Sequence, residues 1–284
     1  MTSTLEKQIQ QFYDASSGLW EQIWGEHMHH GYYGPQGQQR KQRQQAQIDL
    51  IEELLQWSQV SQAEHILDVG CGIGGSSLYL AGRFAANVTG ITLSPVQAER
   101  ATQRARAAGL AARVDFQVAN ALTMPFADDR FDLIWSLESG EHMPDKQKFL
   151  QECCRVLKPG GSLIFATWCH RPLDVGSGGM LTVAEQKQLA EIYRVYCLPY
   201  VISLPEYEQI AQALPLTNLR TADWSAEVAP FWEIVIDSAF NPAALWGILT
   251  AGWQTIEAAL SLSLMSTGYR QGLIRYGLLC GTKV

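Results

Sequence analysis

A glycine-rich turn is the strongest chemical signal in this sequence. The run HILDVGCGIGGSS begins with a β-rich pentad at residues 65–69 and continues into the helical segment SSLYLAGRF. Its glycines are Gly70, Gly72, Gly74 and Gly75. Glycine is required where a backbone must turn sharply and approach a ligand with no Cβ between them. The run therefore predicts that a nucleotide-like cofactor lies against the turn between the strand and the helix.

The glycine spacing leaves the type of cofactor open. Gly70, Gly72 and Gly75 match GxGxxG, which is found in dinucleotide-binding proteins, so a nicotinamide- or flavin-dependent oxidoreductase is one interpretation. Such a site also needs an acidic residue about 20 residues later, at the end of the second strand. The second strand ends instead in GITLS at 90–94. The missing acid argues against a dinucleotide.

Short β-rich runs alternate with helical segments around this turn. Runs that are apolar on both faces and separated by helices indicate a parallel sheet covered on both sides. A helix is expected after Ser94-Pro95, and another that starts at 146 is expected to stop at Pro159-Gly160-Gly161. The predicted strands are 65–69, 88–93, 114–120, 131–137, 162–168, 216–225 and 273–283. The fold class is therefore α/β, with a doubly wound, Rossmann-like, seven-stranded sheet.

Helical segments are expected on both sides of this core. Residues 36–62 are rich in glutamine, but their apolar residues fall near helical spacing, which predicts an amphipathic helix. The most apolar stretch, 240–265, is interrupted by polar residues, so we interpret it as a cap over something apolar and not as a membrane span. The expected division is an N-terminal helical lid at 1–62, a cofactor-binding core at 63–170, and remaining core strands at 171–284 with a helical cap insert at about 226–270.

Composition excludes several classes of function. Of the 284 residues, 47% are hydrophobic and 17% are charged, which suits a folded core and not a disordered chain. The formal net charge is −7, so no general positive field is available to bind a nucleic acid. The first residues contain no apolar signal-peptide core, and the cysteines lack zinc-ligand spacing. We therefore expect a cytoplasmic protein with reduced thiols and no transmembrane segment, and leave peripheral contact with a membrane open.

Several motifs in order resemble those of class I S-adenosylmethionine-dependent methyltransferases. They are Asp68-x-Gly70-x-Gly72, NALTMPFADDRFDLIWS at 120–136 and RVLKPGG at 155–161, and the resemblance covers residues 63–170. It implies that S-adenosyl-L-methionine is the cofactor and S-adenosyl-L-homocysteine the product. The glycine loop, Gly74 included, would face the methionine part, and Asp68 would order the loop or meet the ammonium group through solvent.

The same resemblance also indicates which residues would contact the ribose and the adenine of the cofactor. Most members have an acid after the second strand, whereas the GITLS variant, shared with cyclopropane-synthase-like methyltransferases, implies that Thr92 and Gln97 take that role beside Leu93. Asn120-Ala121 replaces the usual Asp-Ala that meets the adenine, which keeps an acceptor oxygen but loses the charge. An alternative role for Asn120 is that of a turn residue at a strand end. Glu138 is a further candidate for cofactor contact.

The ends of the chain narrow the resemblance to the γ-tocopherol methyltransferase family of plants and cyanobacteria. The matching segments are 13–35, 135–152, 166–172 and 222–239, so the likeness spans almost the whole chain. The family implies C-methylation of a tocopherol-type chromanol at a ring carbon ortho to its phenol, which converts γ-tocopherol to α-tocopherol in vitamin E biosynthesis. Relatives with the same end motifs methylate indole or alkaloid nitrogens, so N-methylation is the alternative.

Transfer to carbon calls for a base, because the phenol should lose its proton so that charge reaches the ortho carbon. His142, just past the fourth strand, is the first candidate for this base, and Glu138 and Glu141 lie close to it in the sequence. The alternative is that His142 has only a structural role.

The substrate is expected to be a hydrophobic aromatic small molecule that binds between aromatic side chains. The alternative is that these side chains only pack against the core. Besides His142, the substrate-site candidates are Trp20, Trp24, Trp168, Trp232 and Trp253. The run HMHH at 27–30 has no matching ligands nearby in the sequence, so no metal is expected.

Overall fold

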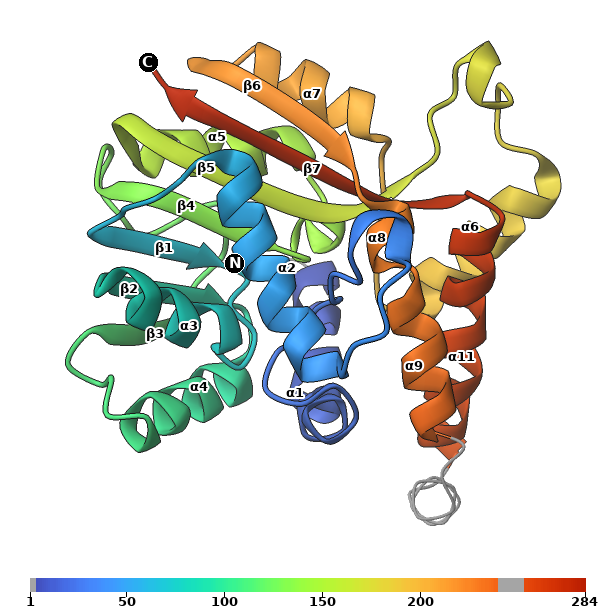
Figure 1. Ribbon diagram of the computed structural model, residues 1–284, viewed down its shortest axis with the longest axis horizontal. Helices are drawn as coiled ribbons and strands as arrows, with labels where there is room; N and C mark the ends of the chain where they lie inside the picture. The colour runs from blue at the N-terminus through green and yellow to red at the C-terminus, as the bar shows by residue number, and fades with distance from the viewer. Residues whose placement is uncertain (1–3, 240–252) are drawn as a thin grey trace.

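A seven-stranded mixed sheet forms the centre of the protein (Figure 1). The computed structural model describes residues 4–239 and 253–284. The strands lie in the order β3-β2-β1-β4-β5-β7-β6, and β7 runs antiparallel to both of its neighbours. The strands are β1 His65–Val69, β2 Asn87–Thr92, β3 Val114–Val118, β4 Phe131–Leu137, β5 Leu157–His170, β6 Leu216–Asp223 and β7 Ile274–Lys283. The predicted doubly wound, Rossmann-like sheet is confirmed.

The strand order reverses between β1 and β4. The chain proceeds outward from β1 through β2 to β3 and then returns to place β4 on the other side of β1, with Ile66 opposite Leu133. Connections from these two strands leave in opposite directions, which opens a crevice at their carboxyl ends. The turn after β1 and the segment after β4 therefore meet at one edge of the sheet.

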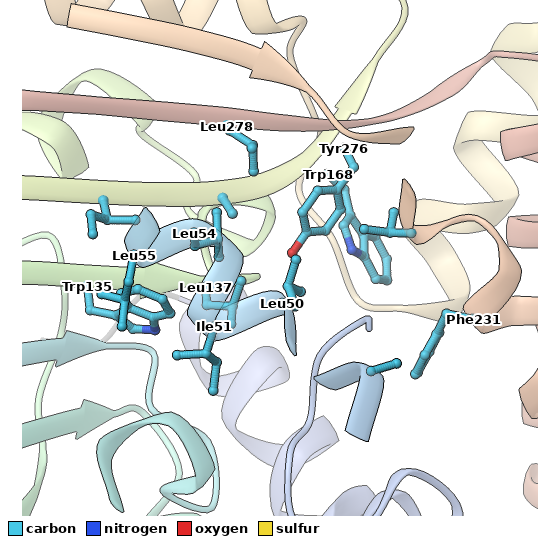
Figure 2. Packing of buried hydrophobic residues seen from close by; sticks show 14 of the residues in the cluster. Leu50, Ile51, Leu54, Leu55, Trp135, Leu137, Trp168, Phe231, Tyr276 and Leu278 are labelled. Carbon is cyan, nitrogen blue, oxygen red and sulfur yellow. The ribbon is translucent and has the colours of Figure 1, made fainter. Parts of the chain in front are cut away.

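Helices cover both faces of the sheet, and each face has its own apolar core. Helices α2, α3 and α4 lie on one face, and α5 and α7 lie on the other (Figure 1). Buried leucines and an isoleucine of α2 pack near Trp135, Leu137 and Leu278, as Figure 2 shows. Burying one such side chain contributes roughly 1.5–3 kcal/mol. The helices are α1 Thr4–Trp24, α2 Arg43–Ser58, α3 Gly75–Phe84, α4 Pro95–Ala107, α5 Lys146–Val156, α6 Val183–Val195, α7 Leu204–Gln212, α8 Ser225–Val228, α9 Pro230–Ala239 and α11 Trp253–Arg270.

Several element boundaries differ from the sequence-based expectation, and two helices are not predicted at all. The helix expected to reach Pro159 ends at Val156, because Leu157 is already extended and pairs with Phe131, so β5 begins five residues before the predicted 162. Helices α6 and α7 lie where no regular pattern is recognised. Each begins with a capping box, at Thr182 and at Ser203. Within 36–62, the helix proper covers only Arg43–Ser58.

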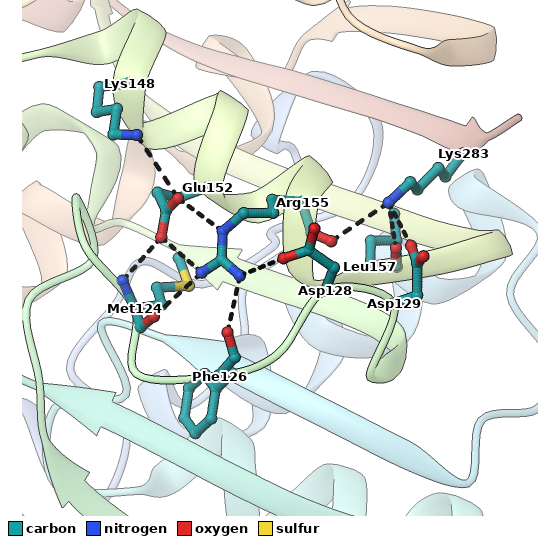
Figure 3. A network of polar contacts seen from close by, with 9 residues as sticks. All are labelled: Met124, Phe126, Asp128, Asp129, Lys148, Glu152, Arg155, Leu157 and Lys283. Carbon is teal, nitrogen blue, oxygen red and sulfur yellow. Dashed lines mark hydrogen bonds and ion pairs between the residues drawn. The ribbon is translucent and has the colours of Figure 1, made fainter.

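A polar network fixes the segment between β3 and β4 (Figure 3). Arg155 of α5 donates to two backbone carbonyls and two carboxylates of its surroundings, and Lys283 of β7 donates to Asp129 and two carbonyls. The acceptors of Arg155 are the carbonyls of Met124 and Phe126 and the carboxylates of Asp128 and Glu152. The network holds the second half of this segment, where the chain enters β4, and the segment begins at Asn120-Ala121 after β3.

Helical segments from the two ends of the chain flank the carboxyl edge of the sheet. Helix α1 packs beside α4, where Ser94 donates a hydrogen bond to Asp14 and Arg100 pairs with Glu21. Helices α9 and α11 pack on one another, and α6 packs on α11. Part of the predicted cap, residues 240–252, lies outside the described residues. Across 4–239 and 253–284, no helix has both the length and the apolar character needed to cross a membrane.

Candidate active site

The turn after β1 adopts a backbone that glycine allows. Gly70, Gly72 and Gly74 have φ angles of 85°, 52° and 81°, a region that L-residues with a side chain rarely occupy. A Cβ at Gly70 would lie 2.2 Å from that of Ser139, and one at Gly74 would lie 2.6 Å from the Phe116 ring. A Cβ at Gly72 would approach only Met28, at 3.7 Å. The space over Gly72 is therefore open to a ligand that contacts the backbone.

Asp68 is buried behind this turn. Its Oδ2 accepts a hydrogen bond from Ser77 Oγ at 2.6 Å, which joins the end of β1 to the start of α3. Burial raises the pKa of Asp68 to about 7, against the opposing effect of the hydrogen bonds from Ser77. Asp68 also lines the main cavity. It is thus placed both to order the glycine turn and to face a ligand.

The end of β2 brings Thr92 and Gln97 together. Thr92 Oγ1 donates to Gln97 Oε1 at 2.8 Å, and both side chains are buried. Ser94 caps α4 by accepting a hydrogen bond from the Gln97 backbone N–H. Thr92, Leu93 and Gln97 all line the main cavity. Because Thr92 engages the amide oxygen of Gln97, the amide NH₂ group of Gln97 is the part left as a donor to a ligand.

A smaller cavity continues past the end of β3, and Asn120 and Ala121 form part of its wall. Asn120 Oδ1 accepts from the Leu122 backbone N–H at 2.9 Å, which is the turn geometry considered as an alternative role. Asn120 Nδ2 donates to Glu6 Oε1 of α1 at 2.7 Å. Asn120 therefore forms a turn and faces the cavity at the same time.

The main cavity lies at the carboxyl edge of the sheet, where β1 and β4 meet. The turn after β1, the end of β2, the segment after β4 and helix α1 all contribute to its wall. It holds about 1110 Å³ of empty space, including the part that opens to solvent. Helix α1 contributes Ile9, Phe12 and Tyr13. One continuous space thus joins the glycine turn to an aromatic wall.

Glu138, directly after β4, has donors on both carboxylate oxygens. His30 donates from its backbone N–H at 2.7 Å and from Nδ1 at 2.8 Å. Tyr276 and Trp168 donate from their O–H and Nε1–H groups at 2.9 and 3.2 Å. Burial alone would raise the pKa of Glu138, but the charge and hydrogen bonds of His30 outweigh it and hold the pKa below the ordinary value. Glu138 is therefore an ionised group that joins the N-terminal segment, β5 and β7.

His142 and Tyr13 contact one another in the wall of the main cavity. His142 Nε2 and the Tyr13 hydroxyl are 2.6 Å apart, and both residues line the cavity. Burial, assisted by the charge of Lys146, lowers the pKa of His142 to about 3. Burial and the charges of Glu141 and Glu138 raise the pKa of Tyr13 above its ordinary value. Both side chains are thus neutral at neutral pH, and they connect α1 to the segment after β4.

Glu141 lies beside His142 and differs in charge from Glu138. Its Oε2 accepts a hydrogen bond from Thr167 Oγ1 at 2.7 Å. Burial and the charge of Glu138 raise the pKa of Glu141 to about 8. Lys146 fixes the same turn by donating to the Glu141 carbonyl at 2.9 Å, and burial lowers the pKa of Lys146 to about 7. One ionised carboxylate and one protonated carboxyl group therefore share the cavity.

Trp168 is the predicted tryptophan that the structure places on the cavity wall, next to Tyr196, whose ring centroid is 5.4 Å away. Trp232 is fully buried behind Trp168, with ring centroids 6.0 Å apart, and does not line the cavity. The side chains of Trp20, Trp24 and Trp253, in α1 and α11, lie outside the described residues. An aromatic layer thus backs the cavity at the end away from the glycine turn.

Comparison with known proteins identifies the family. A methyltransferase domain model matches residues 67–165. Over 287 residues the chain is 47% identical to the chloroplastic tocopherol O-methyltransferase of Arabidopsis thaliana, which covers 98% of this chain and 82% of that protein. The chain belongs to the tocopherol methyltransferase family. This membership decides against the oxidoreductase that the GxGxxG spacing leaves open.

Two further comparisons place this member of the tocopherol methyltransferase family in a wider group. Norajmaline N-methyltransferase of Rauvolfia serpentina is 32% identical over 282 residues, which cover 95% of this chain and 96% of that protein. A crystal structure of geranyl diphosphate C-methyltransferase from Streptomyces coelicolor A3(2), in complex with Mg²⁺, geranyl diphosphate and S-adenosyl-L-homocysteine, matches with a TM-score of 0.77 at 23% identity, covering 99% of this chain and 98% of that one. The second match shows that the fold is shared.

Some cavity residues of this tocopherol methyltransferase family member are missed by sequence reasoning. Glu6 lines the smaller cavity, Tyr13 lines the main cavity, and Ile9 between them lines both, all from one side of α1. Their spacing of i, i+3 and i+7 is a helical stripe, so the sequence did hold a signal for the face of α1 that meets the core. Tyr196, just past the end of α6, lies where no regular pattern is recognised, and no comparable signal marks it.

Proposed function

We propose that this protein transfers a methyl group from S-adenosyl-L-methionine to a ring carbon ortho to the phenol of a tocopherol-type chromanol, converting γ-tocopherol to α-tocopherol. The methyl group replaces the hydrogen of that carbon, which leaves as a proton and restores the aromatic ring. The observation that carries the proposal is the single cavity that joins the glycine turn to Tyr13, His142 and Trp168. Near full-length identity to a tocopherol methyltransferase adds support. The division into a lid at 1–62, a core at 63–170 and a capped remainder is part of the proposal.

The residues present fit the cofactor. S-adenosyl-L-methionine supplies an electrophilic methyl group when bound. The open space over Gly72 suits its methionine part, with Asp68 behind the turn. Gln97 would donate from its amide to the ribose hydroxyls, with Thr92 fixing the amide and Leu93 beside it. Asn120 and Ala121 would meet the adenine in the smaller cavity.

The protein's main contribution to the rate would be positioning. An acceptor carbon must lie in line with the bond that breaks, in a site that excludes water, and such positioning supplies up to about 7–11 kcal/mol of a barrier. Helix α1 closes the cavity through Ile9, Phe12 and Tyr13. Trp168 and Tyr196 would hold the apolar ring system on the opposite side.

Tyr13 and His142 would move the phenol proton. A neutral imidazole has one free lone pair, so His142 Nε2 can accept the hydrogen of Tyr13, and the Tyr13 oxygen can in turn accept the hydrogen of a phenol. Glu138 has donors from three residues, which supports a role in holding the cavity wall. His142 therefore remains the proposed base, and Glu138 the residue that organises its surroundings.

The test is an assay with methyl-labelled S-adenosyl-L-methionine and two acceptors, γ-tocopherol and an indole alkaloid such as norajmaline. We expect labelled α-tocopherol whose phenolic O–H is intact, shown by mass spectrometry and NMR. Product from the alkaloid alone would overturn the tocopherol proposal in favour of N-methylation, the activity named for the relative from Rauvolfia serpentina. A labelled methyl ether would overturn transfer to carbon.

A further inference from the structure

The smaller cavity, next to Asn120, includes a carboxylate from the lid. Glu6 lies in the first turn of α1, is 9% exposed, and lines this cavity opposite Asn120 and Ala121. Its Oε1 accepts a hydrogen bond from Asn120 Nδ2 at 2.7 Å. Residues 6 and 120 are far apart in the chain, so this contact exists only when α1 lies against the sheet edge.

The hydrogen bonds of Asn120 explain what Glu6 adds. The Oδ1 atom of Asn120 already accepts a hydrogen bond from the Leu122 backbone N–H, so a ligand would have to share this oxygen with Leu122. The amide Nδ2 of Asn120 donates to Glu6. Asparagine also brings no charge to a position where a carboxylate would attract an amine. Glu6 supplies that carboxylate, and Asn120 holds one of its two oxygens beside the cavity.

We propose that Glu6 is a cofactor-specificity residue, whose carboxylate, held by Asn120, accepts a hydrogen bond from the 6-amino group of the adenine. The inference rests on the proposed function, because it requires S-adenosyl-L-methionine in this cavity. A hydrogen bond to a charged acceptor is stronger than one to a neutral amide. An oxygen at position 6 of the purine would meet the carboxylate as a second acceptor and would be rejected.

The position of Glu6 on the helix links recognition of the base to closure of the reaction end. Tyr13 follows Glu6 by seven residues on the same side of α1, about 10 Å along the axis, and Ile9 between them lines both cavities. A ligand that binds Glu6 therefore favours the position of α1 in which Tyr13 contacts His142. Adenine would act as a second tether for the lid, besides the contacts of α1 with α4.

The test compares binding of S-adenosylhomocysteine and S-inosylhomocysteine, which carries oxygen in place of the 6-amino group, by isothermal titration calorimetry. The wild type should prefer the adenosine form, and Glu6→Ala should reduce the ratio of the two dissociation constants by about tenfold. Glu6→Gln, which keeps the shape of the side chain without the charge, should reduce the ratio in the same direction.

Glu21→Gln is the matched control. Glu21 is another acidic residue of α1. It pairs with Arg100 of α4 and does not line the smaller cavity. Loosening the lid there should weaken both ligands equally and leave their ratio unchanged. A ratio that is the same in wild type and Glu6→Ala would overturn the proposal, as would a wild type without preference. Absence of S-adenosylhomocysteine binding to every form would instead overturn the proposed function.

Discussion

The contact between Tyr13 and His142 makes the proton transfer testable with single side chains. We expect His142→Gln to lower kcat for γ-tocopherol by about 10²–10⁴, the usual contribution of a general base. Tyr13→Phe should also lower kcat, because it removes the hydroxyl that lies 2.6 Å from His142 Nε2. Steady-state kinetics on the double variant should give no greater loss than the worse single variant, since the two groups act in one step.

If the fold-loss of kcat in the double variant equalled the product of the two single losses, the relay between Tyr13 and His142 would be contradicted. A useful contrast is an acceptor that reacts as a neutral amine, because it requires no prior deprotonation. If the relay acts only on the phenol proton, any slow transfer to such an amine should survive in His142→Gln. Equal loss for both acceptors would assign His142 a structural role.

Glu141 predicts a pH dependence of stability. Its pKa is about 8 in the folded protein and 4.5 for an unperturbed group. Between these values the folded state holds a proton that the unfolded state releases, so the stabilisation is complete below the lower value and is lost as the pH rises through the higher one. Glu141→Gln stays neutral, so its melting temperature relative to wild type should increase from about pH 5 to about pH 9.

Thermal unfolding followed by circular dichroism measures this difference. For a protein of this size, each kcal/mol changes the melting temperature by roughly 2–4 °C. Glu64→Gln is the control, because Glu64 is exposed and its substitution should leave the difference constant with pH. Parallel curves for wild type and Glu141→Gln would show that the Glu141 carboxyl is not protonated preferentially in the folded state.

At the scale of elements, substitutions in the turn after β1 can show separately how the turn affects cofactor affinity and how it affects folding. Gly72→Ala adds a Cβ that meets only Met28, at 3.7 Å, within the protein. Its φ of 52° makes alanine unfavourable by about 1–2 kcal/mol, so the variant should fold. The Cβ occupies the space proposed for the methionine part of the cofactor, and affinity for S-adenosylhomocysteine should fall at least about tenfold.

Gly70→Ala is the matched comparison on the same turn. Its Cβ would lie 2.2 Å from the Ser139 Cβ, and overpacking of this kind costs typically about 1–3 kcal/mol besides the backbone strain. We expect a clear loss of melting temperature before any effect on binding can be measured. Gly72→Ala with unchanged calorimetric affinity would place the cofactor away from this turn.

The sequence predicts an element well where its apolar periodicity and the residues that mark its two ends indicate the same boundaries. Strands β1 and β4 match their predicted ranges in full, because their apolar runs are bounded by glycine and charged residues. Helix α4 begins at Pro95 after the Ser94 cap, as predicted. Helices α6 and α7 are missed although Thr182 and Ser203 open capping boxes, because each helix buries few residues and so carries a weak apolar stripe.

Contacts between distant segments are what the sequence cannot supply. Glycine spacing predicts the turn, and position after a strand predicts Glu138 and His142. Nothing local indicates that Glu138 accepts from His30, 108 residues away, or that Asn120 binds Glu6, 114 residues away. The same limit applies to Trp232, whose burial behind Trp168 depends on how the cap packs.

At the scale of the whole molecule, the two ends of the chain meet around the site. His30 binds Glu138 after β4. The centroid of its ring lies 4.8 Å from that of Phe231 in α9 and 5.3 Å from that of Tyr276 in β7. Helix α1 reaches the same cavity from the other side through Tyr13. Helix α1, the sheet and the C-terminal segments therefore share contacts at one edge of the sheet, so a ligand bound there should stabilise all three.

This arrangement predicts that cofactor binding stabilises the protein as a unit. At a ligand concentration of 100 times Kd, S-adenosylhomocysteine should add about 2.7 kcal/mol, which corresponds to a rise in melting temperature on the order of 5–10 °C. The rise should appear in a single transition, with protection of α1 from proteolysis at the same ligand concentration, because Ile9 and Tyr13 face the cavity. NADH should give neither effect, since the end of β2 offers Thr92 where a dinucleotide requires an acid. Stabilisation by NADH equal to that by S-adenosylhomocysteine would contradict the assignment of the turn, and a melting transition that splits in the presence of ligand would contradict the coupling of lid and core.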